Sequence, residues 1–192
     1  MVSFKEISGS LYGVYLIARR DKFALDYFNI SMAGFYNSFA ALALALPLFA
    51  LENAIDYKGI QTETGFVPFL LLLCLALVVS WGGFLLVLGV LARYIGFFDR
   101  FSLFVTTYNW AQLALVGIWL PLSIITSGLF PPEMVSIIYL LFIGASYVYL
   151  WQILRITLNL SSIMAAGFAF LEFLIAVLTQ AFFSKWLFSG QI

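Results

Sequence analysis

The chain has 192 residues, of which 64% are hydrophobic and only 9% charged, far fewer charged residues than the roughly 25% of an ordinary soluble domain. Nine basic residues balance nine acidic ones, so no global charge attracts nucleic acid, and we expect no nucleic-acid partner. There is no histidine and one cysteine, which excludes an internal disulfide, a cysteine zinc cluster and imidazole ligation of haem or metal. With a mean hydropathy of +1.08, the composition predicts an integral membrane protein without metal or cofactor.

Residues 1–30 form a cytoplasmic or interfacial segment that lacks the features of a secretory signal. Residues 3–22 predict an amphipathic helix lying on the membrane surface, and Ser3 and Glu6 have the spacing of a capping box. The alternative is a solvated arm that docks on the bundle. The apolar positions of the predicted helix are Phe4, Ile7, Leu11, Val14 with Tyr15, and Ala18. Its basic residues, which suit anionic lipid, are Lys5, Arg19, Arg20 and Lys22.

Residues 31–192 predict one transmembrane domain. A helix of about 18 or more apolar residues crosses the hydrocarbon layer, which is roughly 30 Å thick. Residues 66–92 contain no charged side chain, and a polar loop from Glu52 to Gly65 precedes them. The predicted fold class is therefore all-α, a polytopic bundle of five transmembrane helices with an amphipathic N-terminal helix. The expected spans are 31–51, 66–92, 101–127, 133–154 and 161–184.

Five spans place the two chain ends on opposite sides of the membrane. If the N-terminus is cytoplasmic, Lys58 and Lys185 are the only basic residues on the outer side, and the positive-inside rule favours this orientation. The aromatic residues near the expected interfaces, among them Tyr147, Tyr149 and Trp151, are interpreted as membrane belts. The bases on the inner side would be Lys5, Arg19, Arg20, Lys22, Arg93, Arg100 and Arg155.

Glu172 is the one acidic residue deep inside an expected span. A charge at the bilayer centre is unfavourable by about 3 kcal/mol or more, so such a residue faces the bundle interior. Two interpretations stay open: a proton or cation site, or a structural acid that is hydrogen-bonded to a neighbouring span. The candidate polar partners are Asn109, Gln112, Asn37 and Gln180.

Asn109 and Gln112 stand three residues apart, on one face of the third span, where they can bond across helices; interhelical packing is the favoured interpretation. Arg93 and Arg100, with Asp99 between them, could form a headgroup or partner site or simply a positive-inside anchor, and Arg155 is similar. The sequence holds no paired carboxylates, Ser/His/Asp set or phosphate-binding glycine loop, so we expect no enzymatic activity.

The order of features resembles a known family. Phe28-Asn29-Ile30-Ser31-Met32-Ala33-Gly34-Phe35-Tyr36-Asn37-Ser38-Phe39 leads into an Ala-rich span; Arg93-Tyr94-Ile95-Gly96 and Phe101 precede Thr107-Tyr108-Asn109-Trp110; and Tyr147-Val148-Tyr149 to Leu158-Asn159-Leu160-Ser161 leads into the last span. This pattern resembles bacterial members of the Yip family, the Ypt/Rab-interacting five-span membrane proteins. The resemblance implies a non-enzymatic protein of the bacterial inner membrane.

The leading functional hypothesis is membrane organisation, trafficking or partner scaffolding, with the lipid bilayer, protein partners or a homo-oligomer as partners. One alternative is a small ion- or proton-coupled transporter or channel that uses Glu172. Another is an accessory subunit of a larger membrane complex.

Overall fold

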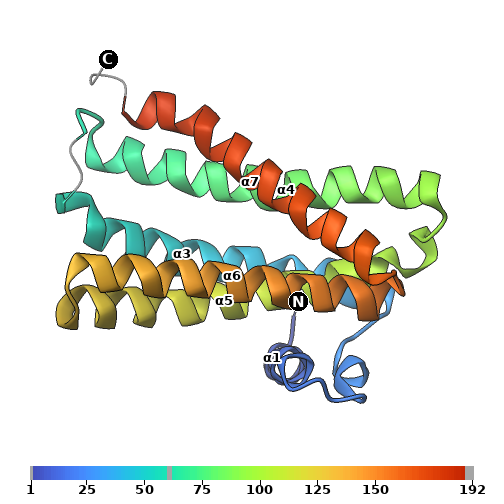
Figure 1. Ribbon diagram of the computed structural model, residues 1–192. Helices are drawn as coiled ribbons and strands as arrows, with labels where there is room; N and C mark the ends of the chain where they lie inside the picture. The colour runs from blue at the N-terminus through green and yellow to red at the C-terminus, as the bar shows by residue number, and fades with distance from the viewer. Residues whose placement is uncertain (1, 60–61, 189–192) are drawn as a thin grey trace.

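The computed structural model describes residues 2–59 and 62–188, and these residues form helices and short connections without strands (Figure 1). Five helical segments are long and apolar enough to cross a membrane: Met32–Ile55, Phe66–Ile95, Phe98–Leu129, Pro132–Leu158 and Ser162–Leu187. The predicted all-α fold with five spans is therefore confirmed, and it is consistent with an integral membrane protein.

The helices follow one another with short connections. The elements are α1 (Phe4–Ala18), η1 (Ala24–Tyr27), α2 (Met32–Ser38), α3 (Ala40–Asp56), η2 (Tyr57–Gly59), α4 (Phe66–Ile95), η3 (Phe98–Arg100), α5 (Phe101–Leu129), α6 (Pro132–Leu158) and α7 (Ser162–Leu187).

The long helices close into a ring in which each packs against two neighbours. Helix α5 packs between α3 and α6, α4 packs between α3 and α7, and α6 packs against α7. Figure 1 shows α3, α5 and α6 on one side of the bundle and α4 and α7 on the other, with α1 lying crosswise beneath the first group. Helix α1 therefore runs across the spans and not along them.

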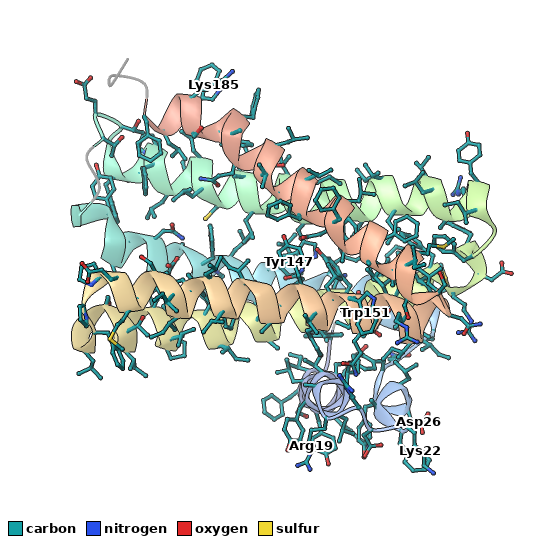
Figure 2. The ribbon with its side chains drawn as sticks, viewed as in Figure 1. Arg19, Lys22, Asp26, Tyr147, Trp151 and Lys185 are labelled. Atoms are coloured by element: carbon teal, nitrogen blue, oxygen red, sulfur yellow. The ribbon has the colours of Figure 1, made fainter. Side chains whose placement is uncertain are left out.

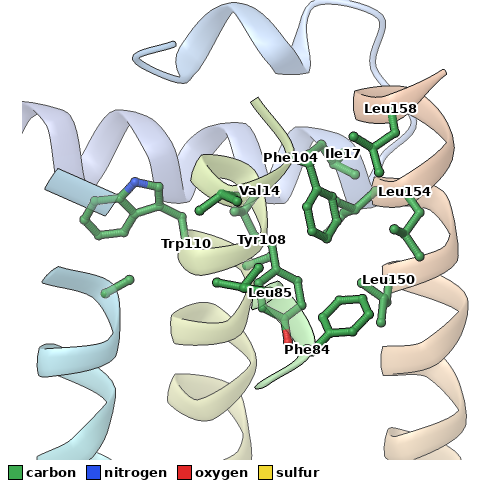
Figure 3. Close-up of a cluster of buried hydrophobic side chains, with 14 of the residues drawn as sticks. Val14, Ile17, Phe84, Leu85, Phe104, Tyr108, Trp110, Leu150, Leu154 and Leu158 are labelled. Carbon is green, nitrogen blue, oxygen red and sulfur yellow. The ribbon is translucent and has the colours of Figure 1, made fainter. Parts of the chain in front are cut away.

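The core surrounds the first half of α5, where residues 104–111 are all buried. This stretch is enclosed because α1, α2, α3 and α6 all pack on α5. Figure 3 shows Val14 and Ile17 of α1 reaching this core. The other residues labelled there are Phe84, Leu85, Phe104, Tyr108, Trp110, Leu150, Leu154 and Leu158.

Helix α1 ends at Ala18, earlier than the predicted Lys22. Ser3 caps its start as expected, because the Glu6 backbone N–H donates to the Ser3 hydroxyl at 3.1 Å. At the other end, the backbone N–H of Asp21 donates to the Leu16 carbonyl and that of Arg20 to the Ile17 carbonyl, which is a Schellman motif. Arg20 adopts the left-handed conformation that this motif requires, with φ 57°.

The first span differs from the predicted continuous helix over 31–51. Helices α2 and α3 are separated at Phe39, where the chain makes tighter turns: the Phe39 N–H donates to the Tyr36 carbonyl, and the Phe39 carbonyl accepts from Leu42. At the far end α3 continues to Asp56, so Glu52 lies in a helix and not in the predicted loop. The Glu52 carboxylate is buried and accepts hydrogen bonds from the Trp119 indole and the Asn53 amide.

Candidate functional site

Asn109 lies at the centre of a hydrogen-bond network that joins three helices. The Trp81 indole of α4 donates to the Asn109 side-chain oxygen at 2.8 Å, and the Asn109 amide donates to the Ser38 hydroxyl of α2 at 2.9 Å. Ser38 donates in turn to the Phe35 carbonyl at 2.7 Å. Asn109 and Ser38 are fully buried. Asn109 therefore serves interhelical packing, as favoured from the sequence, and it does not pair with Glu172.

Asn37 also has a structural role that the sequence did not indicate. Its amide donates to one Glu6 carboxylate oxygen at 2.9 Å, and the Asn29 amide donates to the other at 3.2 Å. The Glu6 side chain thus ties α1 to the start of the first span, and Asn37 is not a partner of Glu172.

Glu172 faces an internal crevice between α5, α6 and α7. The cavity has a volume of about 480 Å³. Tyr147 on α6, and Tyr108 and Gln112 on α5, line this cavity together with Glu172 on α7. Figure 2 shows Tyr147 between the α6 side and the α7 side of the bundle. The structure therefore groups Glu172 with Gln112, as expected, and adds two tyrosines.

The rest of the crevice is mainly apolar, and its outer wall is open to the surroundings of the bundle. Ile143, Phe173 and Val177 line it and are each about half exposed, so the crevice faces lipid between α6 and α7. Gln180 lines the same cavity. A carboxyl with two phenol neighbours can hold a proton or bind a hydrogen-bond donor. The described residues contain no group of three His, Cys, Asp or Glu side chains that could hold a metal ion.

The interfacial arginines do not form one site. Arg93 and Arg100 lie where α4 passes into α5; the Arg93 guanidinium stands 4.7 Å from the Phe98 ring centroid, and Arg100 donates to the Thr157 carbonyl at 3.5 Å. Arg19 donates to the Tyr15 hydroxyl at 3.0 Å, and this bond raises the pKa of the Arg19 guanidinium.

Arg20 and Arg155 come together, although they are far apart in the sequence. Both line a cavity of about 340 Å³ between the end of α1, η1 and α6. The Arg155 guanidinium stands 4.8 Å from the Trp151 ring centroid. Figure 2 shows Arg19 and Lys22 pointing away from the spans. The predicted set of cations therefore divides into an α1–α6 group and a group at the α4–α5 connection.

The docking of α1 depends on two residues that the sequence analysis did not single out as a site. The Tyr149 hydroxyl donates to the Val14 carbonyl at 2.7 Å, and the Gln152 amide donates to the Ile17 carbonyl at 2.6 Å. Tyr149 was interpreted as part of an aromatic belt; it instead anchors α1. Only the spacing of Tyr149 and Gln152, three apart on one face of α6, could have suggested this role.

Comparison with known proteins identifies no relative: no protein-family model matches the chain, and neither a curated protein nor a solved structure matches it.

Proposed function

We propose that the chain is a non-enzymatic integral membrane protein that organises the bilayer around it, with α1 at the cytoplasmic surface. The observation that carries the proposal is that the α5–α6 face and the α4–α7 face of the bundle expose apolar bands of unequal length. A bilayer that meets both sides must deform, because exposing apolar surface to water, or covering polar surface with lipid, is unfavourable.

The band is short on the α5–α6 face, which α1 crosses, whereas the first span on the same side exposes a longer one from Met32 to Ile55. The large exposed apolar residues of α6 extend from Met134 to Val148, which is roughly 21 Å along a helix axis. On α5 they begin only at Ile118. Beyond these positions α1 covers both helices. Helix α1 itself exposes Phe4 and Tyr12, the kind of side chains that lie at headgroup level.

The band is long on the opposite side. Exposed apolar side chains of α4 recur from Val67 to Ile95, roughly 42 Å along the helix, and those of α7 from Ile163 to Trp186, roughly 35 Å. The hydrocarbon layer is about 30 Å thick, so one side is shorter and the other longer than the layer. With α1 occupying space in one leaflet only, the expected result is local thinning and curvature of the bilayer.

The test is the shape of vesicles after reconstitution of the full chain into extruded phosphatidylcholine liposomes. Electron cryomicroscopy should show smaller or tubular vesicles as the protein-to-lipid ratio rises. The double variant Phe4→Ser with Tyr12→Ser, which removes two of the three exposed aromatics of α1, should give vesicles closer to protein-free ones. Vesicles that keep the protein-free size distribution at every protein loading would contradict the proposal.

A matched control is the variant Tyr94→Ser with Ile163→Ser, whose side chains are at least as exposed but lie away from α1. It should shape vesicles as the parent does. If the α1 variant also behaves as the parent, α1 is not the cause.

The proposal agrees with the resemblance to the Yip family and its implied role in membrane organisation or trafficking, and with an N-terminus in the cytoplasm of a bacterium. The bases Arg93, Arg100 and Arg155 lie near one end of the spans and Lys185 near the other. The charge asymmetry supports the orientation through the positive-inside rule.

A second candidate function is ion- or proton-coupled transport, and the placement of Glu172 with two tyrosine hydroxyls in a crevice of about 480 Å³ favours it. In proteoliposomes with an imposed proton gradient, this function predicts proton flux that Glu172→Gln abolishes. The control is Gln180→Ala, on the exposed rim of the same crevice. Flux of the parent at the level of empty vesicles would eliminate transport of protons.

A further inference from the structure

Two cavities on the α1 side of the bundle adjoin one another and differ in character. The first, of about 500 Å³, lies between α1, α5 and α6 and is almost wholly apolar; Leu115, Phe142 and Val148 are among its lining residues. The second, of about 340 Å³, is the cavity of Arg20 and Arg155 described above, and it has the larger polar share of the two; we call it the polar cavity. Arg20 and Gln152 line both cavities, so the two adjoin at the end of α1.

The change from apolar to cationic follows the axis of α6 toward the end of the helix that carries the bases. Phe142 lines the apolar cavity, Gln152 both and Arg155 the cationic one. From Phe142 to Arg155 the helix rises roughly 20 Å. One leaflet, with its headgroups, is about half of the 40–45 Å bilayer thickness, so the length of the gradient matches one leaflet.

The polar cavity carries a surplus of positive charge. It is lined by Arg20, Lys22 and Arg155 against one acid, Asp21, whose carboxylate already accepts the Phe23 backbone N–H at 2.8 Å. Among the described residues, no ion pair engages any of the three cations. Their charges are therefore available to an anion.

The backbone conformation at the end of α1 positions Arg20 at the polar cavity. It occupies the left-handed position of the α1 Schellman motif, where glycine is usual. A non-glycine residue there costs about 1 kcal/mol or more, and such strain is common at binding sites. Gln152 fixes the same end of α1 by its bond to the Ile17 carbonyl.

We propose that the paired cavities bind one anionic phospholipid, with an acyl chain in the apolar cavity of α1, α5 and α6 and the phosphate at Arg20 and Arg155. The site accepts a phosphate because guanidinium groups donate paired hydrogen bonds to phosphate oxygens. It selects a lipid and not free phosphate, because the apolar cavity supplies the larger part of its surface. This inference goes beyond membrane shaping, since a bilayer can be deformed without a bound lipid.

The test is native mass spectrometry of the delipidated full chain titrated with phosphatidylglycerol or phosphatidylcholine of the same acyl chains. The parent should retain one phosphatidylglycerol at least about tenfold more tightly than phosphatidylcholine, because hydrogen bonds between guanidinium and phosphate are charge-assisted. Excess glycerol phosphate should not displace it. Equal affinity for the two lipids, or displacement by glycerol phosphate, would overturn the proposal.

Two kinds of variant locate the site. Arg20→Asn with Arg155→Gln should abolish the preference for phosphatidylglycerol, and asparagine is chosen because it tolerates the left-handed conformation. Ala145→Trp keeps every charge but fills the apolar cavity, which Ala145 lines, and it should weaken the binding of both lipids. The control is Arg19→Gln with Arg93→Gln, which removes two cations that line neither cavity and should bind as the parent. Retained preference in the first variant with lost preference in the control would refute this location.

This result is independent of vesicle shape. If the chain binds phosphatidylglycerol but leaves vesicles unchanged, the lipid site stands and the proposed function fails. If it reshapes vesicles but does not prefer phosphatidylglycerol, the proposed function stands and the lipid site fails.

Discussion

The Trp81 indole N–H and the Asn109 side-chain oxygen lie 2.8 Å apart and join α4 to α5 in the buried centre of the bundle. Helices α4 and α5 are consecutive, yet they share few contacts, because α3 and α7 are the main neighbours of α4. This hydrogen bond is thus a specific link across the ring. It explains why Asn109 does not line the crevice of Glu172, although Tyr108 and Gln112 of the same helix do.

The first prediction concerns this bond. Asn109→Leu leaves the buried Trp81 N–H unpaired and removes the donor to Ser38, and it should lower the free energy of unfolding by about 1–3 kcal/mol. Thermal unfolding in mild detergent, followed by loss of the monodisperse size-exclusion peak, measures the change. Gln112→Leu, one turn away and half-buried, is the control and should have a smaller effect. Equal stability of the parent and Asn109→Leu would count against the structural role.

A second prediction follows from the close approach at Gly34. A Cβ atom there would lie 1.9 Å from the Asn29 carbonyl oxygen, which is backbone and cannot move aside. Gly34→Ala should therefore destabilise the chain by about 1–3 kcal/mol or prevent folding. Gly144→Ala is the matched control: no atom lies within 4 Å of its Cβ position, so replacing a helical glycine should leave stability equal or higher. Comparable melting temperatures for both variants would contradict the geometry.

A third prediction tests how α1 is held. Tyr149→Phe with Gln152→Leu removes the two side-chain bonds to the Val14 and Ile17 carbonyls. At about 1 kcal/mol for each bond, amide hydrogen exchange in α1 should accelerate roughly 30-fold, while the spans keep their protection. Ser146→Ala is a suitable control, because the Ser146 hydroxyl bonds only to Phe142 of its own helix. Unchanged exchange in the double variant would show that apolar packing alone holds α1.

A fourth prediction tests the orientation. Cys74 is the one cysteine, so Cys74→Ala provides a background for single-cysteine labelling. Lys185→Cys should react with a membrane-impermeant maleimide on intact bacterial cells that express the chain, and Lys22→Cys only after permeabilisation, because five spans separate these positions. The reverse labelling pattern would invert the proposed topology.

The five spans could be predicted because each long apolar stretch of this sequence has one solution in a bilayer. Backbone groups in hydrocarbon must bond within the segment, so residues 66–92 and their counterparts become helices whatever their neighbours do. The break at Phe39 could not be predicted in this way. It depends on tight turns between α2 and α3 at the point where Ser38 meets Asn109.

The candidate site was predicted less completely. Glu172 was selected because a lone acid in an apolar span is unusual, and two of its candidate partners, Gln112 and Gln180, line the same cavity. Asn37 and Asn109 were grouped with it wrongly, because side-chain chemistry alone does not say which helix a polar group will face. Tyr147, which contacts Glu172, has no distinguishing mark in an aromatic-rich sequence.

The sequence by itself determined that this protein lies in a bilayer, how many spans it has and how its charges are distributed. These properties follow from length, hydropathy and the order of residues along the chain. The tertiary structure decided which helices are neighbours, where α1 lies and which polar groups meet. Helix α1 could have lain free on the membrane with the same sequence pattern. Its place across α5 and α6 arises from contacts with residues more than a hundred positions away, such as Tyr149 with Val14. That placement brings Arg20 to Arg155 and shortens the exposed apolar band of the α5–α6 face.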